Sequence, residues 1–178
     1  MRIISGLYKN KRLQAPKNLP VRPTTDMAKE ALFNIINNRY YFDSIKVLDL
    51  FSGTGNISIE FASRGTQDIT AVDSHRACIK YIKKTADALD LNIQTVGSDV
   101  YTFLSKAGSK FDLIFADPPY DFTGAQFEAI VSGVFDRDLL AKDGLLIIEH
   151  SKRTKLDHLP KHAFSKKYGG NMFDFFEK

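Results

Sequence analysis

The chain has 178 residues, of which 43% are hydrophobic and 26% are charged. The length fits one domain of roughly 100 to 200 residues, and the composition excludes a disordered or fibrous protein. The net charge of +4 is unevenly spread, because residues 1–30 carry +5, residues 31–150 carry −5 and residues 151–178 carry +4. Two basic ends on a mildly acidic body suggest a polyanionic partner, although solvated chain ends would give the same pattern.

The chain lacks the usual sequence signals of secretion, membrane insertion and metal binding. Cys78 is the single cysteine, so no internal disulfide can form. No apolar run approaches the roughly 20 residues that a membrane span needs. Residues 1–6 contain no long apolar stretch, so we expect no signal peptide, and no Cys/His cluster has zinc spacing. We therefore expect a cytoplasmic protein with no membrane contact and no metal.

Residues 1–24 are predicted to form a basic arm or small hairpin in front of a main domain, residues 25–178. Thr24 and Thr25 supply hydroxyls that can cap a helix, and Asp26 places an acid in its first turn. The arm is rich in cations that could bind phosphates, and these candidate residues are Arg2, Lys9, Lys11, Arg12, Lys17 and Arg22.

Apolar strand patterns alternate with helical patterns along residues 46–178. Five such units in a row predict right-handed crossovers and a doubly wound α/β domain with a parallel, Rossmann-like sheet. Two further strands flank the turn at residues 169–171 without an intervening helix, so we expect a terminal hairpin with one antiparallel strand in a sheet of about seven strands. The predicted strands are residues 47–51, 69–72, 93–96, 111–116, 145–148, 164–168 and 173–176, and the fifth helix spans about 126–140.

A glycine-containing turn follows the first predicted strand. Asp49 lies in that strand, and Gly53 and Gly55 let the backbone approach a ligand closely at the carboxyl edge of the sheet. Asp73 ends the second predicted strand, where a carboxylate can accept hydrogen bonds from both ribose hydroxyls of a nucleoside. The combination predicts a nucleoside-type cofactor, with a plain glycine turn as the alternative.

The residues that this turn lacks narrow the choice among nucleoside-type cofactors. A dinucleotide site would have glycine or alanine three positions after Gly55, where Ser58 stands, and the loop has no basic residue for a diphosphate. Acidic surroundings instead suit S-adenosylmethionine, which is cationic and lacks phosphates. The candidate cofactor residues are Asp49, Phe51, Ser52, Gly53, Gly55, Asp73, Ser98, Asp99 and Asp117, with the pair at 98–99 placed to reach the adenine amino group.

The sequence Asp-Pro-Pro-Tyr at residues 117–120 closes the fourth predicted strand, on the same sheet edge. Two prolines fix the backbone and remove two N–H donors, so carbonyl oxygens remain as acceptors. Asp117 and the Pro118 carbonyl could accept both hydrogens of an exocyclic amine while Tyr120 stacks on the base. Such contacts orient the nitrogen lone pair toward a methyl group. The alternative is a rigid turn that only ends the strand.

These motifs resemble the class I S-adenosylmethionine-dependent amino-methyltransferases. More narrowly, residues 1–6, 22–26, 29–34 and the hairpin at 168–169 look like those of RsmD-type 16S ribosomal RNA guanine-N2 methyltransferases, over essentially the whole chain. Ser5 departs from the family's usual glycine, and Met27-Ala28 replaces a more basic pair. The resemblance implies methyl transfer to a guanine, guanine 966, in 16S rRNA or an assembling small ribosomal subunit, by a protein that we expect to be monomeric.

Other interpretations remain at this stage. An adenine-N6 methyltransferase shares the glycine and Asp-Pro-Pro-Tyr motifs, but a DNA enzyme of that kind usually has a recognition domain for which this chain has no room. A non-catalytic nucleoside-binding or RNA-binding module is the alternative from another class, and a dehydrogenase comes third. His158 and His162 flank Pro160 and are expected in a solvated loop, His150 at a polar strand end and Cys78 in the core.

Overall fold

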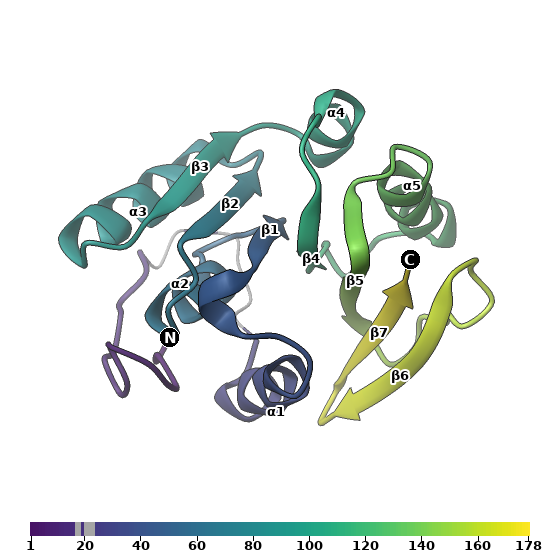
Figure 1. Ribbon diagram of the computed structural model, residues 1–178. Helices are drawn as coiled ribbons and strands as arrows, with labels where there is room; N and C mark the ends of the chain where they lie inside the picture. Colours follow the sequence, from purple (N-terminus) through teal and green to yellow (C-terminus); the bar gives the residue numbers. More distant parts are fainter. Residues whose placement is uncertain (17–18, 20–23) are drawn as a thin grey trace.

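The computed structural model describes residues 1–16, 19 and 24–178, and within these residues a single seven-stranded sheet forms the centre (Figure 1). The strand order is β3-β2-β1-β4-β5-β7-β6. β1 to β5 are parallel, whereas β7 is antiparallel to both β5 and β6. The doubly wound sheet and its terminal hairpin are therefore confirmed. The strands are β1 (Lys46–Leu50), β2 (Asp68–Asp73), β3 (Ile93–Gly97), β4 (Phe111–Ala116), β5 (Leu140–Ser151), β6 (His162–Tyr168) and β7 (Asn171–Glu177).

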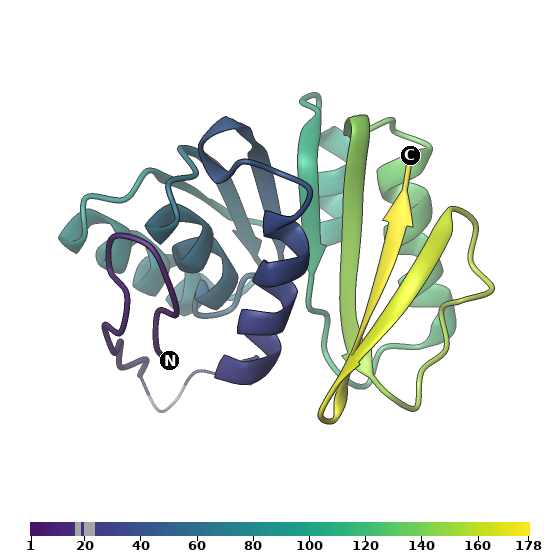
Figure 2. The same ribbon diagram turned by 60° about the horizontal axis from the view of Figure 1, so that its bottom comes forward.

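Helices cover both faces of the sheet (Figure 2). One apolar cluster joins α1 and α2 to β1, β4, β5 and β7, and a second joins α4 and α5 to the opposite face of the same strands. The core thus has two layers because residues of one strand point alternately to the two faces. The helices are α1 (Asp26–Asn37), α2 (Asn56–Ser63), α3 (Arg76–Ala88), α4 (Val100–Lys106) and α5 (Gly124–Phe135), with a 3-10 turn η1 (Phe42–Ser44).

The predicted fifth helix was too long at its end. α5 ends at Phe135, and Asp138 takes a left-handed conformation with φ of 54°. The chain therefore turns before Leu140, which begins β5. Leu139 is buried although it lies in the turn after α5, so the apolar pattern continues beyond the end of the helix. The pattern alone could not show where the helix ends, because a turn can also bury an apolar residue.

The N-terminal segment is anchored to α2 by a buried carboxylate. Glu60 is fully buried, and its two oxygens accept hydrogen bonds from the backbone N–H groups of Ile4 at 2.8 Å and Ser5 at 3.0 Å. Lys29, also buried, lies 3.3 Å from the same carboxylate. Because charge-assisted hydrogen bonds are strong where water is excluded, Glu60 fixes the path of residues 1–13 across the domain.

Gly6 allows this segment to approach α2 closely. Its φ is 83°, and a Cβ at this position would lie 1.8 Å from the carbonyl oxygen of Ser63. That carbonyl accepts a hydrogen bond from the N–H of Leu7 at 2.7 Å. Both the left-handed backbone and the close approach require glycine.

We therefore expect Gly6→Ala to lower the free energy of unfolding by more than about 2 kcal/mol, because the new methyl group must displace backbone. Gly108→Ala is a matched control, since no atom lies within 4 Å of the added Cβ. That control should change stability by less than about 0.5 kcal/mol. Urea unfolding of both variants measures the difference, and equal values would contradict the proposed close approach.

Candidate functional site

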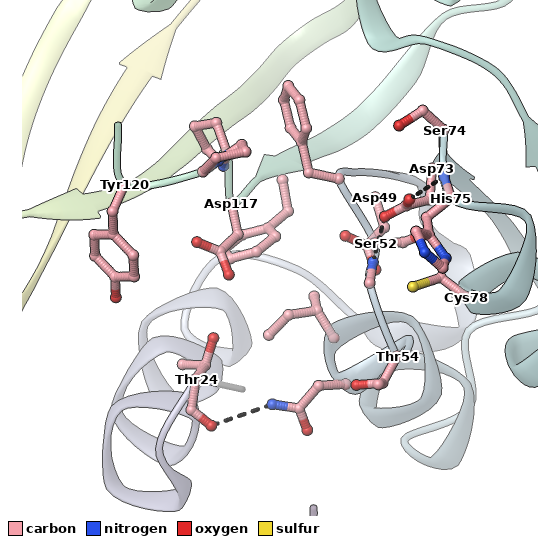
Figure 3. A pocket seen from close by; sticks show the side chains of 17 residues that line it. Thr24, Asp49, Ser52, Thr54, Asp73, Ser74, His75, Cys78, Asp117 and Tyr120 are labelled. Carbon is pink, nitrogen blue, oxygen red and sulfur yellow. Dashed lines mark hydrogen bonds between the residues drawn. The ribbon is translucent and has the colours of Figure 1, made fainter. Parts of the chain in front are cut away.

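A cavity of about 420 Å³ opens at the carboxyl ends of β1, β2 and β4 (Figure 3). Parallel strands place their following loops on one edge, so segments far apart in sequence meet there. Eight residues that the sequence analysis selected line this cavity, namely Asp49, Phe51, Ser52, Gly53, Asp73, Asp117, Pro118 and Tyr120. The structure thus brings the glycine loop, the acid after β2 and the Asp-Pro-Pro-Tyr segment together.

The loop after β1 has an unusual backbone that bends it around one side of the cavity. Phe51, Gly53 and Gly55 have φ values of 58°, 53° and 73°. Gly55 does not line the cavity but caps α2, and a Cβ at this position would lie 2.9 Å from Cγ1 of Ile82 on α3. Glycine at this position therefore lets the loop turn tightly against the neighbouring helix.

Asp73 joins two loops at the cavity wall. Its Oδ2 accepts a hydrogen bond from the N–H of Gly53 at 2.8 Å, and its Oδ1 accepts one from the N–H of His75 at 2.7 Å (Figure 3). A carboxylate has about four acceptor positions, so each oxygen retains capacity for another donor. Asp73 can thus hold the protein loops and still accept hydrogen bonds from a ligand.

Asp49 is a buried acid beside the same loop. Its side chain is almost inaccessible, and Oδ2 accepts hydrogen bonds from the N–H of Ser58 at 3.1 Å and from its hydroxyl at 2.5 Å. Burial raises the pKa of Asp49 to about 7, although the hydrogen bonds from Ser58 lower it. A cation in the cavity would favour the ionised form, because opposite charge lowers the pKa of an acid.

The Asp-Pro-Pro-Tyr segment forms the opposite wall. The N–H of Asp117 donates to the carbonyl of Leu50 at 3.4 Å, which keeps the end of β4 beside the end of β1. Tyr120 is 45% exposed, and its hydroxyl donates to Oδ1 of Asn171 at 3.4 Å. In Figure 3 the Asp117 carboxylate lies between the Tyr120 ring and the residues of the β1 loop. The segment therefore presents an acid and an aromatic ring toward the same opening.

The charges around the cavity favour a cationic ligand. Asp49, Asp73 and Asp117 line it, whereas no lysine or arginine does so among the residues that the structure describes. Carboxylates stabilise a nearby positive charge and repel phosphates. The residues present thus fit a cationic, phosphate-free nucleoside.

Three predicted cofactor residues lie outside the cavity lining. Gly55 shapes the loop, and the N–H of Ser98 donates to the carbonyl of Asp73 at 3.1 Å. Asp99 caps α4, because its Oδ1 accepts a hydrogen bond from the N–H of Thr102 at 2.9 Å. A role of Ser98 and Asp99 in adenine recognition therefore stays a prediction.

The predicted RNA-binding residues lie on the N-terminal segment. Arg2 and Arg12 pair across an isolated antiparallel bridge and line a second hollow, and Arg2 also forms an ion pair with Asp26 at 2.9 Å. The Lys11 ammonium lies 5.7 Å from the centre of the Tyr8 ring. Lys9 is exposed, whereas Lys17 and Arg22 lie outside the described residues.

Several lining residues escaped the sequence analysis. Asn56 and Ile57 extend the glycine loop, and Ser74 and His75 follow Asp73, so extension of each motif by two residues would have found them. Thr24 carried only a helix-start signal. Cys78 is buried as expected but also lines the cavity, where burial and the charge of Asp73 raise its pKa to about 11. The other lining residues lie within predicted elements but were not selected individually, namely Thr54 in the glycine loop, Phe115 in the fourth strand and Pro119 in the Asp-Pro-Pro-Tyr motif.

The histidines that the sequence analysis set aside lie elsewhere. His150, expected at a polar strand end, is buried in β5, and its Nε2 lies 2.8 Å from Oδ2 of Asp174. His162, expected in a loop, begins β6 and contacts the same carboxylate at 3.2 Å. Among the described residues, no group of three potential ligands could hold a metal ion, and no helix is long and apolar enough to cross a membrane.

Comparisons with known proteins agree on one family. The model of the family described as Conserved hypothetical protein 95 matches residues 1–177. YlbH of Bacillus subtilis, provisionally named an rRNA methyltransferase, is 35% identical over 161 residues, which cover 88% of this chain and 85% of that protein. Ribosomal RNA small subunit methyltransferase D of Escherichia coli is 29% identical over 161 residues, which cover 90% of this chain and 79% of that protein.

Solved structures show the same fold. The Escherichia coli protein yhhF, provisionally named a methyltransferase, has a TM-score of 0.87 at 25% identity, covering 100% of this chain and 97% of that chain. The Thermus thermophilus 16S rRNA N2 G1207 methyltransferase RsmC, in complex with AdoMet and guanosine, has a TM-score of 0.72 at 23% identity. That alignment covers 90% of this chain and 45% of RsmC.

The buried acid generates a pH prediction for the ligand-free protein. The folded-state pKa of Asp49, about 7, lies above its ordinary value of 3.8. Between these values Asp49 ionises in the unfolded chain but stays protonated in the folded chain, which costs stability as the pH rises. Asp49→Asn removes this cost and can still accept a hydrogen bond from Ser58. We expect the variant to gain stability over the natural chain as the pH rises from about 4 to about 7, with about 1.4 kcal/mol per pKa unit as the scale. Urea unfolding of both proteins across this pH range tests the effect. A difference in the free energy of unfolding that stays constant with pH would refute it.

Proposed function

Because the chain belongs to the Conserved hypothetical protein 95 family, the RsmD-type class I S-adenosylmethionine-dependent methyltransferases, we propose that it methylates the exocyclic N2 amine of a guanine in 16S ribosomal RNA. Guanine 966 is the position that the family resemblance implies. The observation that carries the proposal is the placement of Asp117, Pro118 and Tyr120 on one wall of an acidic cavity, opposite the glycine loop.

The cavity residues suit S-adenosylmethionine, the cofactor of this family, which supplies an electrophilic methyl group on a sulfonium when bound. The loop that begins at Asp49 would surround its amino acid part, and the carboxylate of Asp49, which lines the cavity, would complement its positive charge. The free acceptor capacity of Asp73 suits the ribose hydroxyls. Each of these roles uses an acceptor that already lies in place in the folded chain.

The opposite wall would hold the base. Asp117 and the carbonyl of Pro118 accept the two hydrogens of the exocyclic amine, and this contact turns the nitrogen lone pair out of conjugation with the ring. Tyr120 stacks on the base, an interaction of about 1 to 3 kcal/mol. The base must leave its stack to reach the cavity, which costs a few kcal/mol in a duplex and less in a loop. Orientation and electrostatics thus supply the catalysis, with no covalent enzyme intermediate.

The names of similar proteins support a ribosomal substrate. One relative is named ribosomal RNA small subunit methyltransferase D, and the fold neighbour RsmC acts on N2 of a 16S rRNA guanine. The basic N-terminal segment suits phosphate contacts, and Lys9, Lys11 and Arg12 form no ion pair with an acid of the described chain. We infer that these cations, with Arg2, bind the RNA backbone, and that Lys17 and Arg22 extend the contact.

Methylation of small ribosomal subunits that lack the modification tests the substrate. The protein is incubated with these subunits and with labelled cofactor, and the RNA is then digested to nucleosides. We expect the label in N2-methylguanosine. Label in N6-methyladenosine would instead support an adenine-N6 methyltransferase, and the absence of transfer to any RNA would support a non-catalytic binding module.

Asp117→Asn tests the role of the acid. We expect kcat to fall on the order of 10²-fold or more, because a neutral amide oxygen is a weaker acceptor for the amine hydrogen than a carboxylate oxygen. The Kd for S-adenosylmethionine, measured by calorimetry, should change less than about threefold. Asp121→Asn removes an exposed acid four positions away that does not line the cavity, and it serves as the matched control. Near-wild-type turnover in Asp117→Asn would exclude this mechanism.

A further inference from the structure

Glu149 is a buried carboxylate in contact with Thr24, a residue that lines the cavity. Glu149 is only 1% exposed and lies near the end of β5. The register of β4 and β5 pairs Ala116 with Ile148, so the next residues in step are Asp117 and Glu149. Glu149 is not among the residues that line the cavity. Glu149 therefore lies beside the segment that carries Asp117, without lining the cavity itself.

Two hydrogen bonds connect this carboxylate to segments from opposite ends of the chain. Its Oε2 accepts from the hydroxyl of Thr24 at 2.7 Å, and its Oε1 accepts from Nδ2 of Asn171 at 2.5 Å. Thr24 lines the cavity just before α1, and Asn171 begins β7 after the hairpin turn. One acid thus holds three elements, namely β5, the start of α1 and the turn between β6 and β7.

The contact with Glu149 also fixes the orientation of the Asn171 amide. A carboxylate oxygen only accepts hydrogen bonds, so the amide nitrogen must face Glu149. The amide oxygen then faces the Tyr120 hydroxyl, which donates to it at 3.4 Å. Without Glu149 nothing in this pair of contacts would distinguish the two amide orientations, and the wrong one would place an NH₂ group against the hydroxyl.

We propose that Glu149 is a positioning residue for the base-binding wall, which acts through Asn171 to place the Tyr120 ring and through Thr24 to hold the start of α1 beside that wall. This inference rests on the proposed function, because it assigns the base to the side of Tyr120. Its effect should be confined to that side. On the cofactor side, Asp73 joins the loops after β1 and β2 by accepting hydrogen bonds from Gly53 and His75, and neither of these two contacts involves Glu149.

A pair of substitutions separates position from charge. Glu149→Gln keeps both hydrogen bonds, because Oε1 can accept from Asn171 while Nε2 donates to the Thr24 hydroxyl. Glu149→Ala removes both. We expect Glu149→Ala to lower kcat on the order of 10- to 100-fold, as a small misplacement of reacting groups does, with the Kd for S-adenosylmethionine changed less than about twofold. Glu149→Gln should retain kcat within about threefold.

Asp174→Ala is the matched control for the loss of a buried carboxylate. Asp174 is 2% exposed, pairs with Ile148 across β5 and β7, and contacts His150 and His162 away from the cavity. This variant should lose stability without the selective loss of kcat. Asn171→Ala, which leaves the contact of Glu149 with Thr24 intact, provides a second test should Glu149→Ala fail to fold, and it should also lower kcat at unchanged cofactor affinity.

Three results would overturn the proposal. One is a loss in Glu149→Gln as large as that in Glu149→Ala, since charge and not position would then matter. Another is a loss of cofactor affinity in Glu149→Ala or Asn171→Ala that is as large as the loss of kcat. The third is a loss of kcat in Asp174→Ala as large as that in Glu149→Ala. Crystal structures of the natural chain and of Asn171→Ala add a readout that needs no activity. We expect the Tyr120 ring in the variant to be displaced from its position in the natural chain. If the natural chain methylates no RNA, the proposed function fails, while this displacement still tests the positioning role.

Discussion

Hydrogen bonds from backbone N–H groups to carboxylates hold the loops at the carboxyl edge of the sheet. A loop that leaves a strand cannot pair its N–H groups with a neighbouring strand, yet those groups need acceptors where water is scarce. Asp73 accepts from two loops, Asp49 accepts from the start of α2, and Glu60 accepts from the N-terminal segment. Two of these acids, Asp49 and Asp73, also belong to the acidic lining of the cavity, whereas Glu60 lies outside it and is paired with Lys29. Asp49 and Asp73 therefore serve both the structure of the loops and the preference for a cationic ligand.

The sheet and the main features of the cavity could be predicted because they depend on local patterns. Short apolar runs predict strands, and the requirement that parallel strands end at one edge brings the loop after Asp49 and the segment after Ala116 together without any knowledge of side-chain contacts. Glycine and proline add constraints that act on the backbone itself. These are the reasons why eight selected residues line the cavity.

Long-range partners could not be predicted in this way. Glu149 and Thr24 are 125 positions apart, and Glu60 is 56 positions from Ile4, so no local spacing reveals either pair. Charge counting also misjudged Lys29, which contributes to the basic N-terminal total but is buried against Glu60. Burial lowers its pKa while the ion pair raises it. A lysine in this position stabilises the packing of α1 and is not available to a polyanion.

The position of β7 has a consequence for the order in which the sheet can be completed. β7 follows β6 in the chain but lies between β5 and β6 in space. During synthesis, β5 keeps an open edge until residues 171–177 have left the ribosome, and open edges of apolar strands invite intermolecular pairing. A nascent chain with β1 to β5 already folded would thus pass through an aggregation-prone interval, which the rapid local closure of a two-strand hairpin shortens.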